Sequence, residues 1–70
     1  MAGEIKSAIE ATKIAQSYIG KYRFFTRPLK AVREDDTWFV DLDVGALNTV
    51  VAKVKIDAKS GEVLEYDIPE

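Results

Sequence analysis

The side chains that could do acid–base or metal chemistry in this chain are carboxylates, lysines and tyrosines, because its 70 residues include no His and no Cys. That composition excludes disulfides, cysteine zinc sites, thiol nucleophiles and an imidazole base. The acidic run Glu34, Asp35 and Asp36 carries the oxygen ligands that Ca²⁺ prefers. Adjacent side chains do not converge, however, and the spacing is not that of an EF-hand, so we interpret the run as a solvated hairpin turn.

A second group of carboxylates, Asp41 and Asp43, lies two residues apart in a predicted strand, so both project from one face. Two carboxylates serve as acid and base only where their environments separate their pKa values. We expect Lys53 and Lys55 opposite them on a solvated face, as a cross-strand ladder of ion pairs. The sequence therefore predicts a protein that is not an enzyme and has no catalytic, metal-binding or cofactor-binding residues.

Residues 21–33 form a basic segment without an acid, in which cations are interleaved with aromatic side chains. Phosphate contacts and base stacking would let such a segment bind single-stranded nucleic acid. A net charge of −2 and the lack of a glycine-containing RNA-recognition motif argue against that partner. The alternatives are a groove for an acidic protein, or aromatic packing with the cationic heads reaching solvent. The interaction candidates here are Tyr22, Arg23, Phe25 and Arg27.

The segment that precedes it, residues 4–19, lacks Pro and Gly and has the apolar periodicity of an amphipathic helix. Gly20 is placed to stop that helix. Ile14 and Tyr18 lie beside the apolar face and either widen it or stay partly exposed. The predicted core face consists of Ile5, Ala8, Ile9, Thr12, Ala15 and Ile19.

Four strand-like runs follow, at residues 29–33, 38–44, 50–56 and 63–68, separated by turns rich in Asp, Gly, Asn and Ser. In the second and third runs the alternation places Trp38, Val40, Leu42 and Val44, and then Val50, Ala52, Val54 and Ile56, on an inner face. In the fourth it places Leu64, Tyr66 and Ile68 inward and Val63, Glu65 and Asp67 outward. In the first run, Leu29 and Ala31 compete with Val32 for the inner face.

Charge narrows the expected register of the second and third runs, although a slip by two residues stays open. If Val44 faces Val50, then Asp41 faces Lys53 on the outer side, and a slip by one residue would bury lysines. Short turns favour antiparallel neighbours. The sequence thus predicts a single α+β domain over residues 1–70, in which one N-terminal helix packs on an antiparallel meander of three to four strands.

This order of elements, with the hairpin VKIDAKSGEVL at residues 54–64 and the strand WFVDL at residues 38–42, resembles the PepSY and PepSY-like domains over roughly residues 5–66. The resemblance implies a protein-binding module without catalytic residues, similar to inhibitory propeptides of secreted peptidases and to extracytoplasmic domains of membrane proteins. The chain departs from that pattern by lacking a signal peptide and an attached peptidase. A weaker resemblance is to the gas vesicle accessory protein O family, whose Arg- and Pro-rich insertion and basic C-terminus are missing.

An apolar strip on the outer sheet face is the remaining surface feature. Alternation directs Phe39, Val51 and Val63 away from the helix, on a face that is otherwise charged. A strip across three strands suggests a protein interface, including a homodimer formed by two sheets. The first residues lack an apolar signal region and no apolar run reaches membrane-spanning length, so we expect a soluble, cytoplasmic protein that does not enter membranes.

Overall fold

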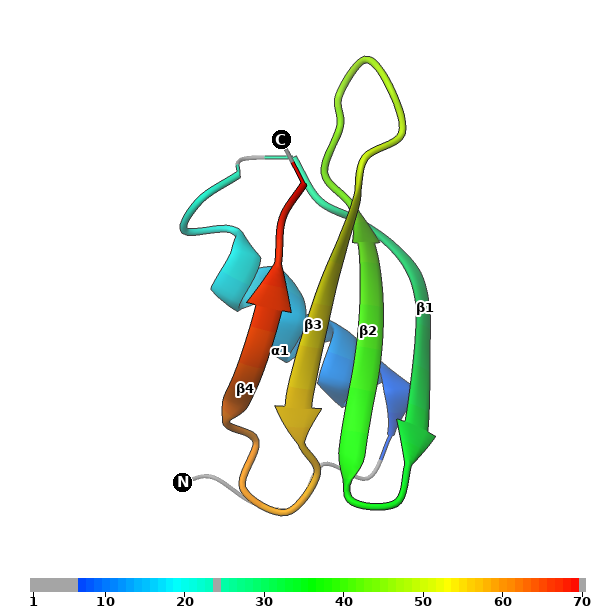
Figure 1. The fold of residues 1–70 in the computed structure, drawn as a ribbon, viewed down its shortest axis with the longest axis vertical. Coiled ribbons are helices and arrows are strands. Elements are labelled where there is room, and N and C mark those ends of the chain that lie inside the picture. The colour runs from blue at the N-terminus through cyan, green and yellow to red at the C-terminus, as the bar shows by residue number, and fades with distance from the viewer. Residues whose placement is uncertain (1–6, 24, 70) are drawn as a thin grey trace.

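In a computed structural model, which describes residues 7–23 and 25–69, one helix packs on one face of a four-stranded antiparallel sheet (Figure 1). The strands follow one another in the order β1-β2-β3-β4. The elements are α1 (Ala8–Ile19), β1 (Arg27–Glu34), β2 (Thr37–Asp43), β3 (Val51–Asp57) and β4 (Val63–Asp67). The predicted two-layer α+β architecture is confirmed. No helix within the described residues is long and apolar enough to cross a membrane.

Helix α1 begins where a serine can cap it. The Ser7 side chain accepts a hydrogen bond from the Glu10 backbone N–H at 3.2 Å, which satisfies one of the free donors of the first turn. The helix therefore starts at Ala8, and the predicted residues 4–6 lie outside the described part of the chain. Gly20 follows the last turn in a right-handed conformation, and a Cβ there would come within 2.9 Å of the Gln16 carbonyl oxygen.

The face that α1 buries differs from the predicted one. Ala11, Ala15 and Ile19 are fully buried, and Ile14 and Tyr18 pack partly against them, whereas Ile9 is 69% exposed. The helix crosses the sheet diagonally, with its first turn near β1 (Figure 1). The predicted inclusion of Ile9 in the core is therefore wrong, because the first turn lies near the sheet edge and small alanines let the middle of the helix approach the strands.

The register of the two central strands agrees with the prediction. Trp38 pairs with Ile56, Val40 with Val54, and Leu42 with Ala52, and all six side chains are buried. On the opposite face, Asp41 pairs with Lys53. Strand β1 is longer than predicted and contains an irregularity between Pro28 and Lys30. As a result Ala31 pairs with Val40 on the inner face, while Val32 pairs with Phe39 on the outer face.

Strand β4 contains a bulge that reverses the predicted direction of its first residues. Val63 pairs with Ile56, but the next pair along the ladder is Glu65 with Lys55, so Leu64 is the extra residue. Val63 therefore packs against the core and Leu64 is exposed, contrary to the predicted outward Val63 and inward Leu64. An added residue shifts the two-residue alternation by one step. Beyond the bulge Tyr66 pairs with the buried Val54, as expected for an inward residue.

Candidate functional site

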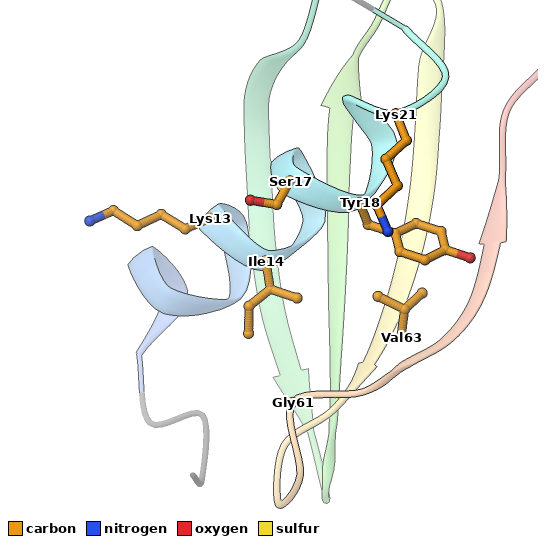
Figure 2. A pocket seen from close by; sticks show the side chains of 7 residues that line it. All are labelled: Lys13, Ile14, Ser17, Tyr18, Lys21, Gly61 and Val63. Atoms are coloured by element: carbon orange, nitrogen blue, oxygen red, sulfur yellow. The ribbon is translucent and has the colours of Figure 1, made fainter. Parts of the chain in front are cut away.

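An open groove lies between α1 and the beginning of β4. It has a volume of about 410 Å³ and is mainly apolar. It is open because α1 packs mainly on β1 and β2 and leaves the beginning of β4 uncovered. Its lining residues, shown in Figure 2, are Lys13, Ile14, Ser17, Tyr18, Lys21, Gly61 and Val63. We call this feature the α1–β4 groove. It was not predicted, and it offers space for the side chains of a partner.

Three tyrosines continue the groove toward the end of α1. The ring centroids of Tyr18 and Tyr66 are 5.1 Å apart, and Tyr22 stacks on Tyr66 at 5.6 Å with an interplanar angle of 15°. Tyr22 and Tyr66 keep 53% and 42% of their surface exposed. The Lys21 ammonium lies 5.4 Å from the Tyr18 ring centroid. The cluster joins helix to sheet, yet still presents aromatic surface to solvent.

The hydroxyl groups of this cluster are also coupled. A hydrogen bond to the Tyr22 side chain raises the pKa of Tyr66 above its ordinary value of 10.0. The contact between Tyr22 and Tyr66 thus joins the turn after α1 to β4 through hydroxyl groups as well as through stacked rings.

The predicted apolar strip on the outer face does not exist as one surface. Phe39 is on that face, where it pairs with Val32 and lies beneath the Lys55 ammonium at 5.7 Å. Val51 pairs with Asp43, whereas Phe39 pairs with Lys55. The charged pair of Asp41 and Lys53 lies between these two pairs and separates Val51 from Phe39. Val63 is on the inner face, in the α1–β4 groove. The prediction of a continuous strip is wrong because it took β4 to alternate without a bulge.

The cations of the basic segment are mostly held by acids of neighbouring strands and turns. Arg27 bonds Asp43 at 3.2 Å, and the Lys30 ammonium lies 4.0 Å from Asp41. Arg33 lies 3.5 Å from Asp36. The other candidates gather elsewhere: a depression of about 220 Å³ is lined by Tyr22, Arg23, Phe25, Val44 and Ala46. Phe24 lies outside the described residues. The segment therefore does not present its cations as one continuous row.

Asp43 is a buried structural carboxylate and not the exposed ladder residue that alternation predicted. The backbone N–H groups of Gly45 and Val50 donate to its Oδ1 at 3.0 and 3.1 Å, and Arg27 donates to its Oδ2. These bonds, those to the backbone N–H groups above all, lower the pKa of the Asp43 carboxyl from the ordinary 3.8. Asp43 thereby closes the loop between β2 and β3.

Because the folded-state pKa of Asp43 lies below its unfolded value, the ionised carboxylate stabilises the fold above about pH 4, and this contribution is lost as the pH falls through the folded-state pKa. We expect Asp43→Asn to lower the melting temperature by several degrees at pH 7 and to weaken the acid-side decline between pH 5 and pH 2. Thermal unfolding followed by Trp38 fluorescence across this range measures both effects. Asp35→Asn, in the exposed β1–β2 turn, is the matched control and should change the midpoint less.

The other carboxylates of the described residues form no metal centre. Asp36 lies in the turn after β1 and makes ion pairs with Arg33 and Lys59, both at 3.5 Å. Among residues 7–23 and 25–69, no group of three or more acidic side chains is placed to hold a metal ion. The predicted hairpin turn is confirmed for Asp35 and Asp36, whereas Glu34 is the last residue of β1 and pairs with Thr37.

Comparison of the chain with protein-family models, curated proteins and solved structures gives no match. The resemblance to PepSY domains thus stays a prediction. The α1–β4 groove had only a partial signal in the sequence: Tyr18 and Tyr22 are four residues apart, as neighbours on a helix face are. That Tyr66 would join them, and that β4 would remain uncovered, depends on the diagonal course of the helix.

Proposed function

We propose that this protein is a small, non-enzymatic protein-interaction module, similar to PepSY domains, that binds its partner through the α1–β4 groove. The observation that carries the proposal is the incomplete cover of the sheet. A groove of about 410 Å³ lies between α1 and the beginning of β4, beside half-exposed tyrosines. Concave apolar surface with a few polar groups at its rim is typical of binding sites. A cytoplasmic location is part of the same proposal.

The charged residues support binding over chemistry. Three carboxylates of the sheet are engaged in structural contacts: Asp43 closes a loop, Asp41 lies beside Lys30, and Glu65 pairs with Lys55 at 3.0 Å. Nucleic-acid binding through residues 21–33 has weaker support, because three cations of that segment lie beside acids. Self-association through the outer sheet face loses its main argument with the inward position of Val63.

A binding selection tests this function. Ser17 is an exposed, small residue of the groove, so Ser17→Arg should fill the site without removing core contacts. Octapeptides selected from a random display library on the natural chain should bind Ser17→Arg about tenfold more weakly or worse. Amide chemical shifts should change along α1 and β4.

The matched control is Asn48→Arg, which adds the same side chain to the exposed β2–β3 loop and should leave binding unchanged. Both variants should have melting temperatures close to that of the natural chain. The weaker peptide binding of Ser17→Arg would then result from the blocked groove and not from unfolding. Selected peptides that bind the two variants equally, or a selection that yields none, would contradict the proposed groove.

A further inference from the structure

The free edge of β4 adjoins the α1–β4 groove. Strand β4 is the last in the sheet and, within residues 7–23 and 25–69, pairs only with β3. Its outer backbone N–H and C=O groups are therefore available to a further strand. In Figure 1 the C-terminal end of α1 extends beyond β4. A strand added there would lie beneath the helix end, with alternate side chains directed toward the tyrosines.

The two edges of the sheet are not equivalent. Strand β1 carries Pro28, an adjacent irregularity and several cations, which are features that protect an edge from pairing. Strand β4 also contains an irregularity, the bulge at Leu64, but its residues 65–67 pair regularly with β3 and include neither a proline nor a lysine. This part of β4 is therefore the less protected of the two edges.

The outer face shows which partner the open edge suits. One row across the sheet alternates in charge through Lys30, Asp41, Lys53 and Asp67. A parallel row ends with Lys55 and Glu65, whose charged groups lie 3.0 Å apart. Both rows end in a carboxylate at the free edge. The next strand would continue the alternation if it placed cations beside Glu65 and Asp67, because opposite charges stabilise cross-strand pairs.

Resting on the proposed function, we propose that the partner is an extended protein segment that alternates basic and apolar residues and adds to β4 as a fifth strand. Its Lys or Arg side chains lie beside Glu65 and Asp67 on the outer face. Its apolar side chains lie on the inner face, beside Tyr66 and beneath the end of α1. Main-chain hydrogen bonds to β4 supply affinity, and the alternation of side chains supplies specificity.

A second copy of this chain does not meet that description. An antiparallel two-fold pairing of β4 centred on Glu65 places two copies of Glu65 opposite each other. Centring it on Tyr66 places Glu65 opposite Asp67 of the second copy. Like charges directly opposite each other destabilise a strand pair. The acidic edge therefore selects a basic segment from another protein.

The test uses the full chain and two synthetic hexapeptides, one alternating valine with lysine and one alternating valine with glutamate. We expect the lysine peptide to bind at least about threefold more tightly at low salt, with amide shifts in β4. The double variant Glu65→Lys, Asp67→Lys should reverse this preference. Glu34→Lys, which changes an exposed charge at the other end of the sheet, should preserve it.

Backbone modification separates strand addition from charge attraction alone. Two versions of the lysine peptide carry N-methyl groups on one edge or on the other. The version methylated on the edge facing β4 should lose binding, and the other should keep it. Equal loss or equal retention would overturn strand addition, and preference for the glutamate peptide would overturn the basic partner. If selected octapeptides still bound the natural chain more tightly than Ser17→Arg, the proposed binding function of the groove would remain supported. If the selection yielded no such peptides, that function would be contradicted as well.

Discussion

Replacing Leu42 with alanine is expected to lower the free energy of unfolding by about 2–5 kcal/mol. Leu42 has no exposed surface, lies in the central strand β2 and pairs with the small Ala52, so its truncation leaves a cavity in the core. A domain of this length has a total stability of only about 4–10 kcal/mol. The variant should therefore lose a large fraction of its stability and unfold at a much lower urea concentration than the natural chain.

The matched control for this substitution is Leu47→Ala, which removes the same atoms from a side chain that is 96% exposed in the β2–β3 loop. We expect its unfolding free energy to stay within about 0.5 kcal/mol of that of the natural chain. Urea unfolding of both variants can be followed through the fluorescence of Trp38, the single tryptophan, which is buried. Equal stability of the two variants would contradict the assignment of Leu42 to the core.

The second large effect is expected at the helix–sheet interface, where Ala15→Glu should cost about 3 kcal/mol or more. Ala15 is fully buried in the middle of α1, between the equally buried Ala11 and Ile19. A glutamate at this position must either place a charge in the core or force the helix away from the strands. Loss of the helical circular dichroism signal at room temperature would show that the helix has separated from the strands and unfolded.

Ile9→Glu introduces the same residue into the same helix at a largely exposed position. An acidic side chain near the first turn also interacts favourably with the helix dipole. We therefore expect a change of less than about 0.5 kcal/mol, although hydrophobicity alone ranks Ile9 above Ala15 as a core residue. If Ile9→Glu proved the more damaging of the two, the helix face described here would be wrong.

Much of the sheet could be predicted because its signals are local. Trp38, Val40 and Leu42 occupy alternate positions, which excludes the registers that would bury lysines. Pairing Asp41 with Lys53 agrees with the observed register, but a slip by two residues also keeps the lysines outside, so the structure was needed to decide between them. The helix was predictable for the same reason, as a periodic segment without Pro or Gly. Its exact buried face was not, because that face depends on the angle at which the helix crosses the strands.

The candidate site was less accessible from sequence. The prediction placed Val63 on the outer face and assembled a strip with Phe39 and Val51, but the bulge in β4 turns Val63 inward. A bulge adds one residue without changing the hydrophobic composition, so alternation alone gives no sign of it. Asp43 was also misassigned, since its burial arises from a loop that folds back on its carboxylate.

The sequence by itself determined the α+β class, the inner faces of the two central strands and the absence of His and Cys chemistry, because residue types and their spacing act over short range. Only the tertiary structure decided which surface is open. The diagonal course of α1 brings its last turn behind the end of β4 but leaves the beginning of that strand uncovered, and the bulge directs Val63 into that space. Helix packing angle and bulge position result from the close fit of side chains across the whole core, so no local pattern encodes them.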